Sequence, residues 1–178
     1  MAQYAVALVL PDEVEKELDR LRGEFARHMA NIYIPHITLA YPFESEADID
    51  QLTERLQQVA ARTKPFTLVL DGFDYFDRDS NVAYIALVNK QPVVELHYDI
   101  NRSIGGLIAD EYRVRFDREG FTPHVTIGTM IPDDILPQVK KRLAEERVHY
   151  ESEITSFSLL SGGEDGRWGV VSEFGLSG

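Results

Sequence analysis

The sequence predicts an α+β fold with a duplicated, bilobal architecture: two antiparallel sheets flanked by helices, with pseudo-two-fold symmetry and a central cleft. Two observations predict it. Strand-like and helix-like stretches alternate along the whole chain. The hexapeptide PHITLA at residues 35–40 also returns as PHVTIG at residues 123–128. Each copy lies between similar elements, so we expect a single domain over residues 1–178 with two interleaved lobes.

The first repeat begins with an apolar stretch at residues 4–10, which is typical of a buried strand. Pro11 and Asp12 then open a helix, and the first hexapeptide follows it as a second strand. The apolar side chains of the helix recur at intervals of four, three and four residues, which places them on one face. They are Val14, Leu18, Leu21 and Phe25.

A second helix follows the first hexapeptide, and Ser45 is its predicted N-terminal cap. Its apolar stripe is Ile49, Leu52, Leu56 and Val59. Residues 66–76 and 82–88 both have the composition of strands, and the polar run at residues 77–81 is typical of a turn. We therefore expect these two strands to form a hairpin.

The second repeat resembles the first in the order and spacing of its elements. His36 lies 30 residues before Phe66, where a strand begins, and His124 lies 30 residues before Ile154, inside the equivalent strand. The remaining expected elements are a helix at residues 92–107, a polar strand at 112–116, a helix at 133–146, and strands at 149–160 and 168–174 with a turn-forming loop at 161–166.

The composition restricts the class of protein and of partner. A net charge of −12 disfavours binding of long duplex nucleic acid, whose affinity depends on basic side chains that neutralise phosphates. The chain has no cysteine, and therefore no disulfide or thiolate chemistry. We see no signal peptide and no membrane-spanning run. We expect a cytoplasmic monomer that acts on a small ligand.

The two hexapeptides carry the chemistry. In a strand, residues i and i+2 point to the same face, so His36 projects with Thr38, and His124 with Thr126. If the two strands lie side by side, one cleft holds two imidazoles that titrate near neutrality and two hydroxyl donors. This set suits a phosphate ester. Proline before each histidine fits the first position of a strand, where no ladder hydrogen bond is lost.

Two His-x-Thr-x strands in a duplicated α+β chain of this length resemble the 2H phosphoesterase superfamily, which includes 2′-5′ RNA ligase-like proteins and cyclic phosphodiesterases. The resemblance covers essentially the whole chain, including the closing strand WGVVSEF, and is nearest to a bacterial phosphoesterase branch. Many ligase-type members have an arginine soon after the second motif. Here these positions are Gly128, Thr129 and Met130, which argues against ligase-like handling of RNA ends.

The resemblance implies metal-independent opening of a 2′,3′-cyclic phosphate or a related phosphodiester, without a cofactor. It implies His36 and His124 as the catalytic acid and base, with His124 favoured as base by analogy, and Thr38 and Thr126 as phosphate ligands. The substrate would be a small nucleotide or the cyclic phosphate at an RNA end. Two alternatives stay open: 2′-5′ RNA ligase-like end processing, and a nucleotide-binding module with low turnover.

Other residues have a functional and a structural interpretation. Arg113 and Arg115 share a face of the polar strand and are candidates for substrate binding, although a salt-bridged surface strand explains them equally well. Two further groups are expected to be structural. The unrepeated histidines are expected at the surface or behind the site, and most cleft aromatics in the core, although one of them can stack on a base. These residues are His28, His97 and His149, and Tyr41, Phe43 and Trp168.

Overall fold

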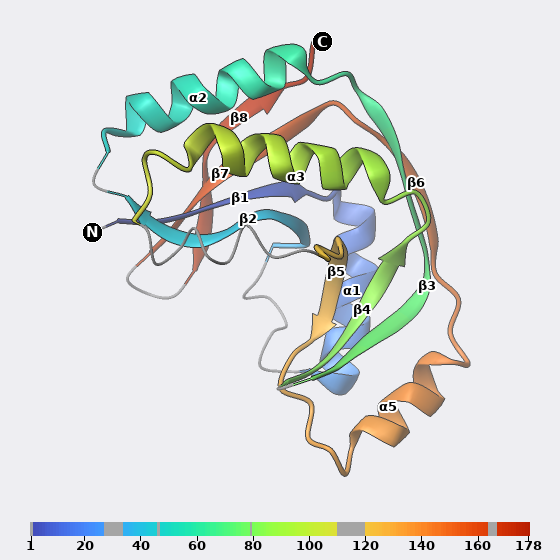
Figure 1. Ribbon diagram of the computed structural model, residues 1–178. Coiled ribbons are helices and arrows are strands. Elements are labelled where there is room, and N and C mark those ends of the chain that lie inside the picture. The colour runs from blue at the N-terminus through green and yellow to red at the C-terminus, as the bar shows by residue number, and fades with distance from the viewer. Residues whose placement is uncertain (1, 27–33, 46, 79, 110–119, 164–166) are drawn as a thin grey trace.

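The computed structural model describes residues 2–26, 34–45, 47–78, 80–109, 120–163 and 167–178. Within these residues the fold is α+β, with four helices and eight strands (Figure 1). The helices are α1 (Asp12–Phe25), α2 (Ile49–Arg62), α3 (Gln91–Ile104) and α5 (Leu136–Leu143). The strands are β1 (Ala2–Val9), β2 (His36–Ser45), β3 (Phe66–Arg78), β4 (Ser80–Leu87), β5 (His124–Gly128), β6 (His149–Ile154), β7 (Ser156–Gly162) and β8 (Trp168–Gly175).

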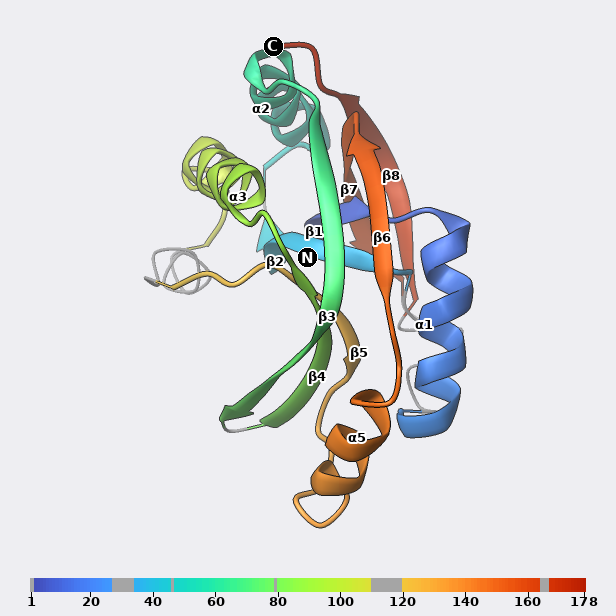
Figure 2. The same cartoon turned by 90° about the vertical axis from the view of Figure 1, so that its right-hand side faces the viewer.

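The strands form one curled antiparallel sheet in the order β6-β3-β4-β5-β2-β1-β7-β8 (Figures 1 and 2). The expectation of two separate sheets is therefore wrong. The reason is that the two hexapeptide strands pair directly, through a bridge between Ile37 in β2 and Val125 in β5. We call β2-β1-β7-β8 the first half-sheet and β5-β4-β3-β6 the second half-sheet.

The two half-sheets repeat the same register, as pseudo-two-fold symmetry requires. In the first, Val9, Ala7 and Val6 of β1 pair with His36, Thr38 and Ala40 of β2. In the second, Ala86, Tyr84 and Ala83 of β4 pair with His124, Thr126 and Gly128 of β5. Both ladders also have an irregularity at the same place, directly after the threonine pair. Such bulges increase the local twist of a strand.

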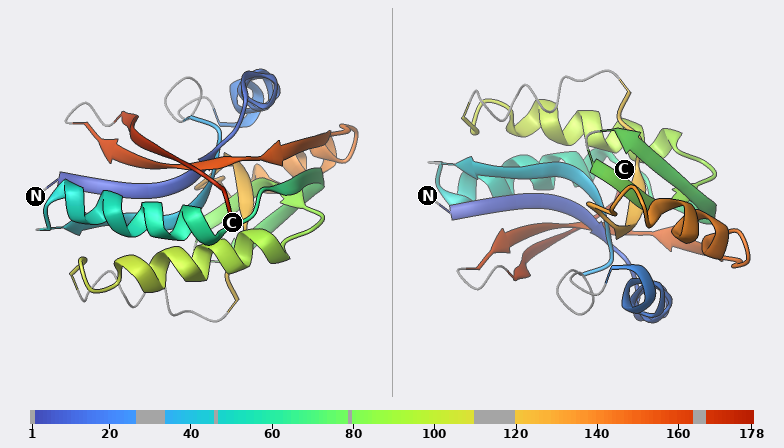
Figure 3. Two further views of the ribbon diagram at one scale, coloured as in Figure 1. Left: turned by 90° about the horizontal axis from the view of Figure 1, so that it is seen from above. Right: turned by 90° about the horizontal axis from the view of Figure 1, so that it is seen from below.

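Each half-sheet is completed by elements from the other repeat. Strand β3 follows the first motif in sequence but pairs with β4 and β6, whereas β7 pairs with β1. The helices are exchanged similarly: α1 connects β1 to β2 but packs on β5, and α3 connects β4 to β5 but packs on β2. Helices α2 and α3 lie side by side, and α1 lies apart from both (Figure 3).

Two details differ from the sequence prediction. Asp48, not Ser45, caps α2, since its side chain accepts from the backbone N–H of Asp50. Ser45 is the last residue of β2 and donates instead to the carbonyl of Leu107. The strand expected at residues 149–160 is two strands. Before Thr155 the chain pairs with β3 as the edge strand β6, and after Thr155 it pairs with β1 and β8 as β7. Apolar alternation carries no information about which neighbour a strand takes.

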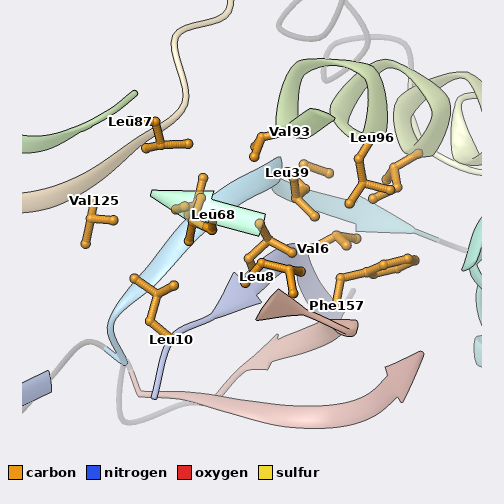
Figure 4. Packing of buried hydrophobic residues seen from close by; sticks show 14 of the residues in the cluster. Val6, Leu8, Leu10, Leu39, Leu68, Leu87, Val93, Leu96, Val125 and Phe157 are labelled. Atoms are coloured by element: carbon orange, nitrogen blue, oxygen red, sulfur yellow. The ribbon is translucent and has the colours of Figure 1, made fainter. Parts of the chain in front are cut away.

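The main core lies between the helices and one face of the sheet (Figure 4). Ile37 and Leu39 of β2 and Val125 and Ile127 of β5 are fully buried in it. These residues alternate with the histidines and threonines of the motifs, so the opposite face of the same strands carries the polar side chains. Helix α3 contributes Val93, Leu96, Ile100 and Ile104 to the core, at helical spacing.

Helix α1 approaches β5 so closely that β5 needs a glycine there. A Cβ placed on Gly128 would lie 2.8 Å from the Cβ of Ala26, which directly follows α1. This contact accounts for the glycine that ends the second hexapeptide without any role in catalysis. It also fixes the end of α1 against the strand that carries His124 and Thr126.

We predict that Gly128→Ala lowers the free energy of unfolding by about 1–3 kcal/mol, because the new methyl group overpacks this contact. Urea denaturation measures the change. Gly169→Ala in β8 is the matched control, since a Cβ there meets nothing within 4 Å. Ala26→Gly should restore most of the stability lost in Gly128→Ala. Equal effects of both alanine variants would contradict the packing explanation.

Candidate active site

Each motif histidine is oriented by a carbonyl two residues before it. His36 Nδ1 lies 2.6 Å from the carbonyl oxygen of Ile34, and His124 Nδ1 lies 2.8 Å from that of Thr122. A carbonyl oxygen only accepts, so Nδ1 carries the hydrogen in both rings. When neutral, each imidazole therefore has its lone pair on Nε2, the nitrogen able to take or give a proton at a ligand.

The proline inside each motif explains why the same bond forms twice. Proline restricts the preceding residue to extended conformations, so the carbonyls of Ile34 and Thr122 have few available directions. Pro35 and Pro123 are both buried, and the carbonyl of Pro35 accepts from the N–H of Leu10. The short segment before each strand is thus fixed, and with it the carbonyl that orients the histidine.

The bridge between Ile37 and Val125 brings the two motifs together. Continuing this antiparallel register by one residue in each direction places His36 opposite Thr126 and Thr38 opposite His124. All four side chains then lie on one face, and the two histidines are diagonal neighbours, at about 7–8 Å between backbone positions. This separation leaves room for a tetrahedral phosphate between the two imidazoles.

Burial lowers the pKa of both motif histidines. For His36 and for His124, desolvation is the main cause, because it disfavours the charged imidazolium, and the carbonyl hydrogen bond opposes it in part. The positive charge of His36 further lowers the pKa of His124, which agrees with their closeness. The pair therefore titrates as a coupled unit, in which one proton disfavours the second.

A buried arginine lies behind the motifs, and sequence reasoning missed it. Arg22 of α1 is only 2% exposed, and its Nη2 donates to the backbone carbonyl of Thr126 at 3.0 Å. Its charge also lowers the pKa of His36. The sequence signal that could have revealed its burial is its position. Arg22 follows Leu18 by four residues and so lies at the border of the apolar stripe of α1, next to the core.

His97 is buried on the core side of β2, where it contacts both β2 and the segment that leads into β5. Its Nδ1 donates to the carbonyl of Leu39 at 2.7 Å, next to Thr38. Its ring also stacks on Phe121, three residues before His124, at 3.7 Å between centroids and 5° between planes. Asn101, one turn later in α3, donates to the same carbonyl at 2.9 Å.

The surroundings of the two histidines differ. The ring of His124 packs against Phe76 and Tyr84, with centroids 5.0 and 5.1 Å away. Burial, followed by the nearby Asp74 carboxylate, raises the pKa of the Tyr84 phenol to about 12, so it stays protonated. His36 instead borders a pocket with a mostly apolar lining. The site is thus symmetric in its four polar side chains and asymmetric around them.

The other candidate residues divide into three groups. Arg113, Arg115 and His28 lie outside the described residues. His149 is exposed and lies 3.0 Å from Asp71, far in the register from the motifs. Among the aromatics, Phe43 is buried in the core, Tyr41 packs against it, and Trp168 lines the pocket beside His36.

In the described part of the chain, no group of three or more His, Asp or Glu side chains is arranged to hold a metal ion. No helix there is long and apolar enough to cross a membrane.

Comparison with known proteins identifies the family. The family model described as the 2′-5′ RNA ligase superfamily matches residues 10–166. The chain belongs to this superfamily. The resemblance carried by the two hexapeptides is thereby confirmed. A member from Geobacillus thermodenitrificans, named "Putative phosphoesterase", is 30% identical over 99% of this chain and 97% of its own length. A Bacillus anthracis protein of the same name is 32% identical over 92% of this chain and 90% of its own.

Solved structures share the fold of this superfamily member. The protein TT0787 of Thermus thermophilus matches with a TM-score of 0.70 and 20% identity, covering 99% of this chain and 98% of that one. Escherichia coli LigT complexed with 3′-AMP matches with a TM-score of 0.70 and 17% identity, covering both chains completely. At these identities the likeness concerns the fold alone.

We predict that the protein loses stability as the pH falls from 7 to 5. His36, His97 and His124 all have a lowered pKa in the folded state, mainly through burial. Below about pH 6.5, their ordinary pKa, the unfolded chain binds protons that the folded chain does not, so unfolding is favoured. The loss continues until the pH falls below the folded-state values. Thermal unfolding across this range measures it.

His97→Asn is the matched variant for this experiment. Asparagine offers a donor for the Leu39 carbonyl but does not titrate, so the fall in unfolding temperature between pH 6.5 and 5 should become shallower. At pH 7 the variant should be less stable than the wild type by about 1–3 kcal/mol, since the stack on Phe121 is lost. An unchanged slope would show that His97 is not among the groups responsible.

Proposed function

We propose that this protein is a metal-independent phosphoesterase that hydrolyses a 2′,3′-cyclic phosphate or a related small phosphodiester. One observation carries the proposal. The two motif histidines occupy one face of adjacent strands, and the same Nδ1–carbonyl bond leaves Nε2 of each available. Two such nitrogens can supply the general base and the general acid that hydrolysis requires.

The proposed step exchanges one bond at phosphorus for another. A water oxygen attacks the phosphorus atom, and Nε2 of the basic histidine accepts the water proton. The bond between phosphorus and one sugar oxygen breaks, and the other histidine, which starts protonated, donates its proton to that oxygen. The product is a phosphomonoester with one free hydroxyl, and the two histidines have exchanged protonation states, which solvent then restores.

The surroundings support His124 as base and His36 as acid. The leaving oxygen belongs to the organic part of the substrate, and the pocket that can hold that part borders His36. On the other side, the rings of Phe76 and Tyr84 pack against His124 and restrict the space around it. A small group such as water suits this restricted space better than the organic part of the substrate. Burial lowers the pKa of both histidines, so the assignment of the two roles rests on the position of the pocket.

Thr38 and Thr126 are proposed to donate to the non-bridging phosphate oxygens. They point to the same face as the histidines, and hydroxyl donors aimed at these oxygens stabilise the charge that develops during attack. The carbonyl of Thr126 is held by Arg22, which fixes the backbone at this position. The net charge of −12 favours a small substrate over a long polyanion. The complex of LigT with 3′-AMP supports a nucleotide as the organic part.

We predict that His36→Ala and His124→Ala each reduce hydrolysis of nucleoside 2′,3′-cyclic phosphates by about 10²–10⁴-fold. Phosphorus NMR of chelator-treated protein measures conversion and shows which phosphomonoester isomer forms. His149→Ala is the matched control, because this histidine is exposed and pairs with Asp71 outside the site. Activity that survives in either motif variant, or that disappears with the chelator, would overturn the proposed chemistry.

The pH dependence of hydrolysis should be bell-shaped and displaced to acid. Catalysis needs one proton on the pair, and burial places the pKa of both histidines below 6.5 in the free protein. We therefore predict a maximum of kcat/KM below pH 6.5 and a fall above it. A bound anionic phosphate favours the imidazolium, so the maximum of kcat should lie at higher pH. A profile that is flat between pH 5 and 8 would exclude two titrating histidines.

A further inference from the structure

Both half-sheets contain a bulge directly after the motif threonine. In the first, the register of β2 with β1 skips Leu39, between the pairs made by Thr38 and Ala40. In the second, the register of β5 with β4 skips Ile127, the residue that follows Thr126. A bulge disrupts the ladder locally and re-aims the side chains beside it, and bulges are frequent next to active sites. The buried backbone groups at a bulge therefore need partners outside the ladder.

At each bulge, the helix that packs on the strand provides such a partner. Arg22, in the last turn of α1, donates through Nη2 to the carbonyl of Thr126 at 3.0 Å. In α3, His97 donates through Nδ1 to the carbonyl of Leu39 at 2.7 Å, and Asn101 donates through Nδ2 to the same oxygen at 2.9 Å. Each carbonyl belongs to a peptide bond that joins the bulged residue to its neighbour. Both bulges are thus held by side chains of the helices.

The three donors are buried at a cost in free energy. Arg22 is 2% exposed, His97 1% and Asn101 7%, whereas arginine and asparagine are mostly exposed in proteins. Burial lowers the pKa of Arg22, which reflects the cost of desolvating its charge. The Oδ1 atom of Asn101 is buried and has no hydrogen-bond partner among the described residues, which is itself unfavourable. Polar groups kept in a core against such costs are typical of functional sites.

The bonds at the bulges matter because the ladder between the two motif strands is short. In the described part of the chain, β2 and β5 share the single register pair Ile37–Val125. One pair fixes which residues are opposite but constrains the twist between the strands weakly. A bond to the peptide group beside each threonine adds the missing constraint. Helices α1 and α3 lie apart from each other, so the two threonines are constrained independently (Figure 3).

We propose that Arg22, His97 and Asn101 are positioning residues, which direct the motif threonine hydroxyls by holding the carbonyls at the two bulges. Arg22 acts on Thr126, and His97 acts together with Asn101 on Thr38. The proposal rests on the proposed function, in which these hydroxyls donate to the phosphate. A catalytic group displaced by about 1 Å can lower the rate by about 10²-fold, so side chains that act only through the backbone have a measurable effect on turnover.

The first experiment measures the direction of the threonine side chains without turnover. Three-bond NMR couplings to the methyl carbon show whether the χ1 angle of a threonine stays in one rotamer or is averaged. In the wild type, both motif threonines should keep one rotamer. Arg22→Met should cause averaging at Thr126 and not at Thr38, and Asn101→Leu should cause it at Thr38 and not at Thr126. Rotamers that are the same in all three proteins would overturn the proposal, whether or not the protein is an enzyme.

The second experiment measures kcat and KM for adenosine 2′,3′-cyclic phosphate. Arg22→Met should lower kcat by about 10- to 100-fold and change KM less, because the hydroxyl stabilises charge that develops during attack. This effect should nearly vanish in a Thr126→Val background, which lacks the hydroxyl, and persist in Thr38→Val. Equal effects in both backgrounds would mean that Arg22 acts by another route, such as its charge on His36, and would overturn its role. Arg102→Met, at an exposed position of α3, is the matched control.

Asn101→Leu separates positioning from a purely structural role. The Leu39 carbonyl keeps its bond to His97, and the other acceptor of Asn101, the carbonyl of His97, lies inside α3. The substitution also removes the buried Oδ1, so stability should stay equal or increase. We expect kcat to fall severalfold nevertheless, and the fall to vanish in a Thr38→Val background. An unchanged kcat would contradict the role of Asn101. This variant also covers the case in which Arg22→Met fails to fold.

The outcomes separate this proposal from the proposed function. If the wild type hydrolyses the cyclic phosphate and the variants at Arg22 and Asn101 keep its kcat, the positioning role is wrong and the phosphoesterase stands. If the wild type does not hydrolyse it, the proposed function fails, and the threonine rotamers alone decide the positioning role. His97→Asn, which offers a donor for the Leu39 carbonyl, should keep more of kcat than His97→Leu, which offers none. Equal losses in these two variants would contradict the role of His97.

Discussion

The architecture depends on one antiparallel bridge, between Ile37 of β2 and Val125 of β5. It joins two four-stranded half-sheets into one sheet, and it buries both of its own side chains in the core. Because side chains alternate in a strand, burial of these two residues commits their neighbours to the opposite face. A slip of one residue would exchange the faces and bury the histidines. The core therefore enforces the register on which the candidate active site depends.

The site combines a symmetric part with an asymmetric part, and these have different origins. The symmetric part is local: a proline, and a carbonyl two residues before each histidine that sets its tautomer. The asymmetric part comes from neighbouring strands, where Ala7 and Tyr84 occupy equivalent positions. Under the proposed function, duplication supplies two equal proton carriers, and divergence around them supplies a direction for the ligand. A hydrolytic reaction needs both, since attacking and leaving groups lie on opposite sides of phosphorus.

Local patterns in the sequence predicted local features. Alternation predicted that His36 and Thr38 share a face, and helical spacing predicted α1, α2 and α3. Features set by partners distant in sequence were not predictable. Neither motif states that β2 and β5 pair, so one sheet was taken for two. Arg22 looks like a surface residue of a charged helix, and only the carbonyl of Thr126, 104 residues away, explains its burial. For His97 the sequence left open a place at the surface or behind the site, because its partners Leu39 and Phe121 belong to two other segments.

The exchange of strands between the repeats has a consequence for synthesis on the ribosome. Ala5 of β1 pairs with Leu160 of β7, which is translated 155 residues later. At about 5–20 residues per second, this edge of β1 waits roughly 8–30 s for its neighbour. An apolar strand with an open edge is prone to pair with other chains. The nascent N-terminal half is therefore the stage at which a chaperone would protect this protein most.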